Sequence, residues 1–183
     1  MRIGIDISQI VYTNSGVGTY VRRMVESIIS LDTTNEYILF GSSLRKREEF
    51  AFFYQALHCD SSRVMLRTWP IPPSVLDILW NRLHVLPIEW FIGKIDVFWS
   101  SDWTQPPLSH ACGITTIHDV SIFHYPKSFH RKILAVQKRR LAYAKKVCLA
   151  FLCDSEATRK DVIELMHIDE KKIHVVYPGY TAL

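Results

Sequence analysis

Cysteine is scarce in this 183-residue sequence, and the four that occur show no C-x-x-C spacing. They lie in or beside apolar runs, as buried free thiols do, which favours a reducing compartment. No stretch of about 18 consecutive apolar residues occurs, so no segment is long enough to span a bilayer. The chain opens with charges at Arg2 and Asp6, where a secretory signal needs an unbroken apolar stretch. These absences predict a cytoplasmic protein, with peripheral attachment to the inner face of a membrane left open.

Spacings typical of metal sites are absent as well. The eight histidines are scattered, with no H-x-x-x-H pair and no pairing with cysteine. A zinc site needs such spacing because its ligands must converge on one ion. We therefore predict no metal and no cofactor.

Acidic residues are missing from Val120 to Cys153, although the whole chain carries 18 of them against 22 lysines and arginines. Positive potential is therefore concentrated in this stretch, and much of it lies on one predicted helix. We expect this helix to bind an anionic surface, such as lipid headgroups, through Arg131, Lys132, Lys138, Arg139 and Arg140. A solvated helix face is the alternative. No motif that reads bases accompanies the charge, which predicts no nucleic-acid partner.

Short β-branched runs alternate with longer stretches of helical period, the pattern of a parallel sheet with helices on its faces. The length allows one α/β domain. We predict a Rossmann-like three-layer sandwich whose mainly parallel sheet has about seven strands. The predicted strands are 2–7, 36–40, 63–69, 96–100, 113–117, 147–153 and 172–177. One helix is predicted after Gly18, and others are predicted at 45–57, 74–86, 129–146 and 156–167.

A glycine-containing loop joins the first predicted strand to the first helix. Gly16, Val17, Gly18 and Tyr20 lie where glycines let backbone approach a phosphate and a helix N-terminus offers N–H groups to an anion. The dinucleotide-binding fingerprint is incomplete, because its third glycine would fall at Val21 and no acidic residue ends the second strand. This disfavours a nicotinamide or flavin site. We favour a loop that faces a phosphate or substrate over a loop that merely makes a tight turn.

Two further polar groups follow predicted strands. His118 and Asp119 come after 113–117, at the strand ends where ligands of open α/β sheets gather. His118 can donate to a hydroxyl or to developing phosphate charge, and Asp119 can orient it or accept from a sugar hydroxyl. A capping aspartate beside a solvent-facing histidine is the alternative. Ser155 and Thr158 begin the last predicted helix, where capping explains them and lining of a cleft is the functional alternative.

Taken in order, these segments resemble glycosyltransferase family 4, the retaining GT-B enzymes, and within it the mannosyltransferase-like members. The matching segments span nearly the whole chain and are 1–6, 16–22, 32–37, 116–120, 140–144, 155–161 and 172–179. Each segment is weak alone, and the ordered set is fairly specific. The chain departs from the family pattern at Tyr180 and Thr181, where Val-Asp is usual.

The resemblance implies two Rossmann-like domains that face each other across a cleft. It makes residues 1–177 the acceptor-side domain and 178–183 the start of a linker to a donor-binding domain that is absent from this chain. It puts Gly16 and Gly18 beside the donor diphosphate and acceptor, and His118 opposite the transferred sugar, with Asp119 supporting that loop. The implied partners are a nucleotide-sugar, a glycan or glycolipid acceptor, and the protein's own C-terminal domain.

The donor ligands of the family, a basic pair and an E-x7-E motif, belong to the second domain. Since the resemblance assigns no residue here to them, we predict that the intact protein is a hexosyltransferase and that residues 1–183 alone are inactive. Mannose is the candidate sugar. The alternative is a non-catalytic α/β module that binds an anionic lipid or phosphorylated ligand, or that pairs with a separately encoded donor domain.

Overall fold

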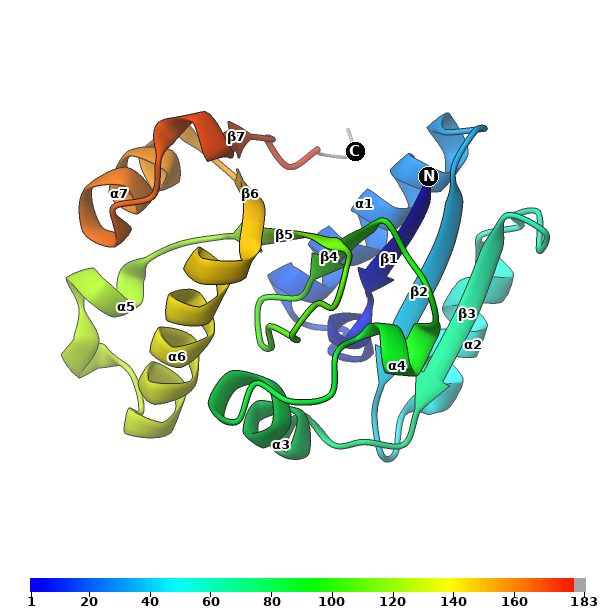
Figure 1. Cartoon of the computed structure of the whole chain (residues 1–183), viewed down its shortest axis with the longest axis horizontal. Coiled ribbons are helices and arrows are strands. Elements are labelled where there is room, and N and C mark those ends of the chain that lie inside the picture. Colours follow the sequence, from blue (N-terminus) through cyan, green and yellow to red (C-terminus); the bar gives the residue numbers. More distant parts are fainter. Residues whose placement is uncertain (180–183) are drawn as a thin grey trace.

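A seven-stranded parallel sheet with the order β3-β2-β1-β4-β5-β6-β7 runs through the molecule (Figure 1). The computed structural model describes residues 1–179. Its strands are β1 (Arg2–Asp6), β2 (Glu36–Ser42), β3 (Val64–Trp69), β4 (Val97–Ser100), β5 (Cys112–Ile117), β6 (Cys148–Cys153) and β7 (Ile173–Val175). Every predicted strand is confirmed with small shifts at its ends, and so is the Rossmann-like α/β sandwich.

Helices cover both faces of this sheet. They are α1 (Gly16–Leu31), α2 (Arg47–Ala56), α3 (Pro73–Leu76), α4 (Glu89–Ile92), α5 (Ser121–His124), α6 (Arg131–Val147) and α7 (Glu156–Met166). Short 3-10 turns are η1 (Ser8–Val11), η3 (Pro126–Ser128) and η4 (Glu170–Lys172), and η2 (Asp77–Arg82) is a π-helix. Within residues 1–179, no helix is long and apolar enough to cross a bilayer.

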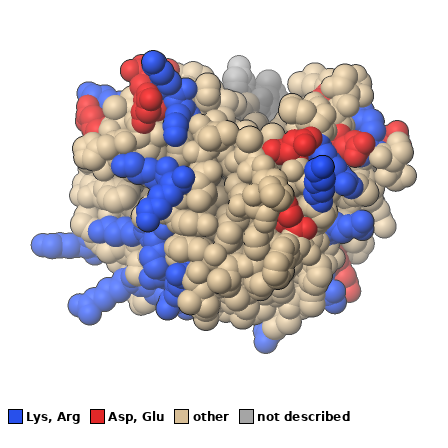
Figure 2. Space-filling model, in the orientation of Figure 1, with Lys and Arg blue, Asp and Glu red and all other residues tan. Residues whose placement is uncertain are grey.

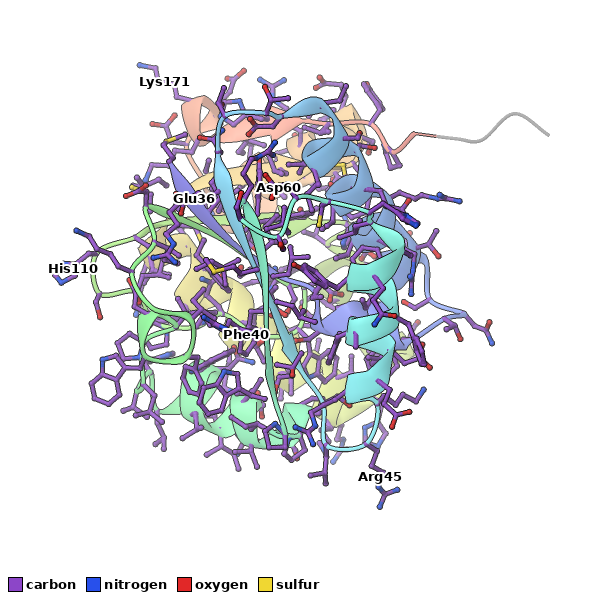
Figure 3. The ribbon with its side chains drawn as sticks, turned by 90° about the vertical axis from the view of Figure 1, so that its right-hand side faces the viewer. Glu36, Phe40, Arg45, Asp60, His110 and Lys171 are labelled. Carbon is purple, nitrogen blue, oxygen red and sulfur yellow. The ribbon has the colours of Figure 1, made fainter. Side chains whose placement is uncertain are left out.

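Strand β2 shows why the sheet needs helices on both sides. Tyr37 and Leu39 point to one face, where they join the apolar stripe of α1 and two phenylalanines of α2. Ile38 and Phe40 point to the other face, where α3, η2 and α4 pack. Figure 3 shows Phe40 in the interior, between the two ends of the strand pair β2 and β3. A strand that is apolar on both faces must be covered twice, which is the arrangement of a central parallel strand.

The prediction of one α-helix over 74–86 is wrong, because Asp77–Arg82 within this segment forms a π-helix. The chain makes a single α-helical turn and then widens into η2, where the N–H of Leu83 donates to the carbonyl of Ile78 at 3.0 Å. The wider turn buries Asp77, Trp80 and Asn81 together, each less than 5% exposed. Both kinds of helix place one apolar stripe inward, so the periodicity of the sequence does not separate them.

Candidate functional site

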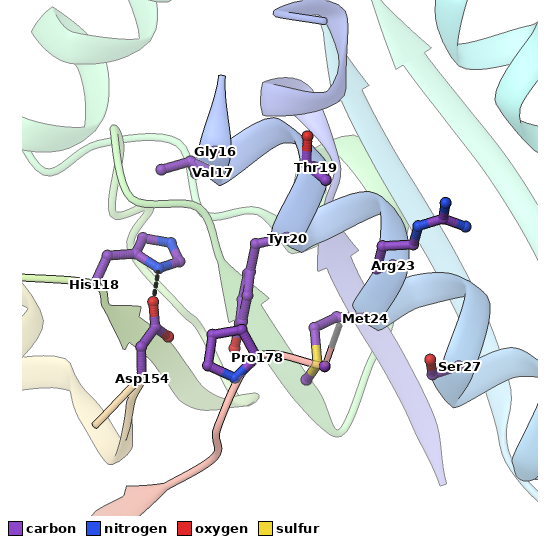
Figure 4. A pocket seen from close by; sticks show the side chains of 11 residues that line it. Gly16, Val17, Thr19, Tyr20, Arg23, Met24, Ser27, His118, Asp154 and Pro178 are labelled. Atoms are coloured by element: carbon purple, nitrogen blue, oxygen red, sulfur yellow. Dashed lines mark hydrogen bonds and ion pairs between the residues drawn. The ribbon is translucent and has the colours of Figure 1, made fainter. Parts of the chain in front are cut away.

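A cavity of about 710 Å³ opens beside the carboxyl ends of β5 and β6 and along the first turns of α1 (Figure 4). Its lining residues are Gly16, Val17, Thr19, Tyr20, Arg23, Met24, Ser27, His118, Asp154, Pro178 and Gly179. Ligands of parallel α/β sheets bind outside these strand ends. The cavity therefore brings the predicted glycine loop and the predicted histidine to one place.

The two glycines of the loop have different surroundings. A Cβ on Gly18 would lie 2.8 Å from the carbonyl oxygens of Gln9 and Tyr12, so a side chain is excluded there by the backbone of η1. A Cβ on Gly16 would meet nothing within 4 Å, because this residue faces the cavity. Gly18 is not among the lining residues of the cavity, and its contact with a donor stays a prediction. Its role is to let η1 and α1 approach each other.

The start of α1 offers unpaired donors to the cavity. The side chain of Ser15 caps the helix by accepting from the N–H of Gly18 at 3.4 Å. The N–H groups of Gly16 and Val17 have no partner within residues 1–179. The first turn carries no acidic residue, so the positive end of the helix dipole is not neutralised there. Arg23 lies further along the cavity wall, where its guanidinium pairs with Glu26 at 2.9 Å. This wall can bind an anionic group.

His118 is held in place from two sides. Its Nδ1 lies 2.7 Å from Oδ2 of Asp154, and the ring of Tyr20 stands edge-on to it with centroids 4.8 Å apart (Figure 4). An ionised carboxylate can only accept, so Nδ1 carries the proton of this bond and Nε2 is left for another partner. A histidine oriented in this way can exchange a proton or a hydrogen bond with a ligand.

The two residues that contact the ring of His118 each contain a buried oxygen without a hydrogen-bond partner. The hydroxyl of Tyr20 and Oδ1 of Asp154 are both buried and make no hydrogen bond within residues 1–179. Burial raises the pKa of the Tyr20 phenol, which keeps it protonated and able to donate. Unsatisfied buried polar groups are rare in folded proteins, and they cluster where a ligand or water completes the network.

Asp119 lies outside this cavity. Its Oδ1 accepts from the N–H of Ser121, the first residue of α5, at 2.8 Å. It lines a smaller cavity of about 150 Å³, which shares His118 and Val17 with the larger one. Asp119 thus shapes the loop that carries the histidine, while Asp154 is the residue that orients the ring.

Ser155 and Thr158 are not among the lining residues of the cavity. The Ser155 hydroxyl accepts from the N–H of Thr158 at 3.1 Å, as an N-cap does. Thr158 is 9% exposed and donates its own hydroxyl to the carbonyl of His118 at 3.2 Å. Their predicted place in the cleft wall is taken by Asp154, and their hydroxyls connect α7 to the loop after β5.

Arg140 is wrongly predicted as a surface cation. It is 2% exposed and donates from one terminal nitrogen to the carbonyls of Ser101 at 2.9 Å and Thr116 at 3.1 Å, and to the hydroxyl of Thr115. Burial lowers the pKa of its guanidinium, and the nearby Asp102 carboxylate opposes that shift. The reason for its burial is position, because it shares one face of α6 with Val136 and Ala144, which are also buried.

The other four predicted cations of α6 remain accessible to different degrees. Arg131, Lys132 and Lys138 are exposed, and Arg139 is partly buried. The guanidinium of Arg139 lies 3.4 Å from the carboxylate of Asp77 in η2. Figure 2 shows basic side chains gathered over α6 on the left of the molecule.

Sequence reasoning missed Asp154, although a signal for it exists. In the sheet, Ile117 of β5 is paired with Cys153 of β6. The next residue of each strand is therefore His118 and Asp154, side by side. Thr19 and Arg23 were missed as well, because the prediction for the α1 region covered only Gly16, Val17, Gly18 and Tyr20.

Two glutamates with E-x7-E spacing occur in the chain, but they lie outside the cavity that contains His118. Glu156 and Glu164 are on α7, with side chains 61% and 58% exposed, and neither lines the cavity. They pair with Arg159 at 3.1 Å and Lys160 at 3.9 Å. This is the charge pattern of a solvated helix surface.

The structure is a Rossmann-like domain in which a helix N-terminus and an oriented histidine face the same cavity. The model of the family described as Glycosyltransferase Family 4 matches residues 14–181. The chain therefore belongs to glycosyltransferase family 4, as the order of its motifs indicates. A comparison with curated proteins gave no match.

Proposed function

We propose that this chain is the N-terminal, acceptor-side domain of a retaining glycosyltransferase. The intact enzyme transfers a hexose, for which mannose is our candidate, from a nucleotide-sugar to a glycan or glycolipid acceptor. The observation that carries the proposal is the pairing of His118 with Asp154 beside the free N–H groups that begin α1. Family membership supports the class of reaction.

The chemistry of retaining transfer fits this arrangement. The bond from the sugar to the diphosphate breaks while an acceptor hydroxyl attacks the same face of the sugar, so negative charge develops on the leaving diphosphate. The N–H groups of Gly16 and Val17 can stabilise that charge. Nε2 of His118 can hydrogen-bond the transferred sugar while Asp154 keeps the ring oriented. We propose that these groups act with cations of the second domain and without a metal.

The proposal includes an inactive isolated domain. The exposure of Glu156 and Glu164 on α7 supports a donor site built by other residues. Purified residues 1–183 should show no turnover with any nucleotide-sugar, and turnover without added protein would overturn this part of the proposal.

A second histidine–carboxylate pair provides a matched control for the site. His124 lies 2.9 Å from Asp161 and does not line the cavity. In the full-length enzyme, assayed against a panel of nucleotide-sugars, we expect His118→Asn to lower kcat by about 100-fold or more. We expect His124→Asn to change it little. Equal effects of the two substitutions would contradict the assigned role of His118.

The competing function is a binding module without catalysis, which the accessible cations of α6 favour. The reading frame beyond Leu183 separates the two proposals. A continuation of about 150 to 200 residues, the length of a typical domain, with a glycine-rich loop, a basic residue and E-x7-E supports the enzyme. A stop codon directly after Leu183 supports the binding module.

A further inference from the structure

A second cavity of about 650 Å³ lies between η2 and the start of α6. Its lining includes Asp77, Ile78 and Arg82 of η2, Lys132 of α6, and Trp103. It shares no lining residue with the cavity that contains His118. Asn81 fixes its wall by donating to the carbonyl of Trp103 at 3.1 Å and accepting from the N–H of Gln105 at 3.0 Å. The cavity is therefore separate from the first one, and hydrogen bonds fix part of its wall.

Positive charge exceeds negative charge around this cavity. The buried carboxylate of Asp77 is shared by two guanidinium groups, with Arg82 at 3.2 Å and Arg139 at 3.4 Å. Lys132 is exposed at the cavity and has no carboxylate within 4 Å in the part of the chain that the structure describes. Nε of Arg139 is buried without a hydrogen-bond partner in that part. One carboxylate against three cations leaves the site suited to an anion.

An exposed apolar stripe borders the same cavity. Val75, Ile78 and Leu83 are 39%, 45% and 59% exposed. Ile78 follows Val75 by three residues, a spacing that puts both on one side of an α-helix. Leu83 follows Ile78 by one π-helical turn, because its N–H donates to the carbonyl of Ile78. Ile133, next to Lys132 on α6, is 40% exposed as well. A soluble phosphate ligand would not need exposed aliphatic side chains beside its binding site. A lipid would, because these side chains can lie at the boundary between headgroups and acyl chains.

The basic and apolar parts are held together as one surface. Besides the ion pair between Arg139 and Asp77, the ring of His84 stacks on Tyr143 of α6 with centroids 3.7 Å apart. In Figure 2, the basic side chains over α6 adjoin an uncharged expanse that reaches over α3. Cations beside exposed aliphatic side chains are the composition of surfaces that lie in a bilayer interface.

We propose that this second cavity binds the phosphate headgroup of an anionic lipid, with Lys132 and Arg82 at the phosphate and the stripe of Val75, Ile78 and Leu83 among the upper acyl carbons. Since Arg140 is buried, the exposed cations do not cover α6 uniformly. The proposed headgroup site is therefore confined to the start of α6, where it faces η2. Lipid binding does not depend on glycosyl transfer, so either proposal can fail without the other.

Sedimentation with vesicles tests the proposal on the 183-residue chain. We expect binding to vesicles of phosphatidylglycerol and phosphatidylcholine, and much weaker binding to phosphatidylcholine alone. Lys132→Gln should weaken binding to the anionic vesicles about fivefold, the effect of one interfacial cation. Ile78→Ser combined with Leu83→Ser should weaken it by about tenfold or more, since two aliphatic side chains no longer leave water.

Matched controls come from other parts of the surface. Leu31 is 83% exposed at the end of α1, and the side chain of Lys160 is 75% exposed on α7. Leu31→Ser and Lys160→Gln should bind vesicles as the unchanged protein does. Equal losses in these controls would overturn the site, as would equal binding to both kinds of vesicle.

Glycerol 3-phosphate distinguishes a lipid from a soluble ligand. Thermal stabilisation by this compound that Lys132→Gln removes, in a protein that fails to bind vesicles, would assign the cavity to a soluble phosphate and overturn the lipid proposal. Vesicle binding that the compound weakens, and that also needs Ile78 and Leu83, would support it.

Discussion

His118 and Asp154 are hydrogen-bonded partners because their strands are neighbours, although 36 residues separate them along the chain. The bond runs from Nδ1 of the histidine to Oδ2 of the carboxylate. It leaves Nε2 as the ring atom available to a ligand. The position of the proton on this ring is therefore a property that the fold imposes.

This tautomer can be measured directly. We expect the neutral form of His118 to carry its proton on Nδ1, and Asp154→Ala to shift it towards Nε2, because the acceptor at Nδ1 is lost. Nitrogen-15 chemical shifts of the imidazole at high pH report the tautomer. Asp119→Ala serves as the control, since that carboxylate accepts from the N–H of Ser121 instead. An unchanged spectrum in Asp154→Ala would contradict the assigned bond.

The two glycines of the α1 loop should respond differently to alanine. Gly18→Ala places a Cβ 2.8 Å from two carbonyl oxygens, and we expect it to lower the free energy of unfolding by about 1 to 3 kcal/mol. Gly16→Ala has open space around its Cβ and should leave stability within about 0.5 kcal/mol. Urea denaturation of both variants provides the comparison. A larger loss in Gly16→Ala would show that the α1 loop is arranged differently.

Arg140 should behave as a structural residue. Arg140→Met leaves the Ser101 and Thr116 carbonyls without their donor, and we expect a loss of about 3 kcal/mol in the free energy of unfolding. Arg131→Met, at an exposed position on the same helix, should change it by no more than about 0.5 kcal/mol. Similar unfolding midpoints for the two variants would contradict the buried, structural role of Arg140.

The four cysteines should differ in reactivity. Burial raises the pKa of Cys148 to about 12 and that of Cys153 to about 11. At pH 8 both therefore remain thiols, whereas the thiolate is the form that reacts with iodoacetamide. Cys112 is exposed and should be alkylated first. Mass spectrometry of the folded protein at pH 8 should find Cys148 and Cys153 unmodified, and their labelling before Cys112 would contradict this burial.

The strands were predictable because each is a short apolar run in a sheet covered on both faces. Ile38 to Phe40 has this character, and all three side chains are fully buried. The helices α4 and α5 were missed because each has four residues, too few to show a period. The π-helix η2 was missed because periodicity reports which side is buried and not the width of the turn.

The site was predictable only in part. His118 and Gly16 follow strand ends in the sequence itself, so reasoning from strand positions reached them. The partner of His118 depends on which strand lies beside β5, and that order is a property of the whole sheet. Arg140 stands within a run of cations, which suggests exposure, yet its spacing of four from Val136 and from Ala144 was a signal for burial.

The sheet order also determines which strands can pair first during synthesis. Strands β3, β2 and β1 all lie within the first 69 residues, so these three strands can pair while the ribosome is still making the rest. His118 emerges later, and its partner Asp154 emerges 36 residues after it. A nascent chain that stalls between them would contain His118 without its carboxylate partner, so the hydrogen bond between His118 and Asp154 can form only after β6 has been made.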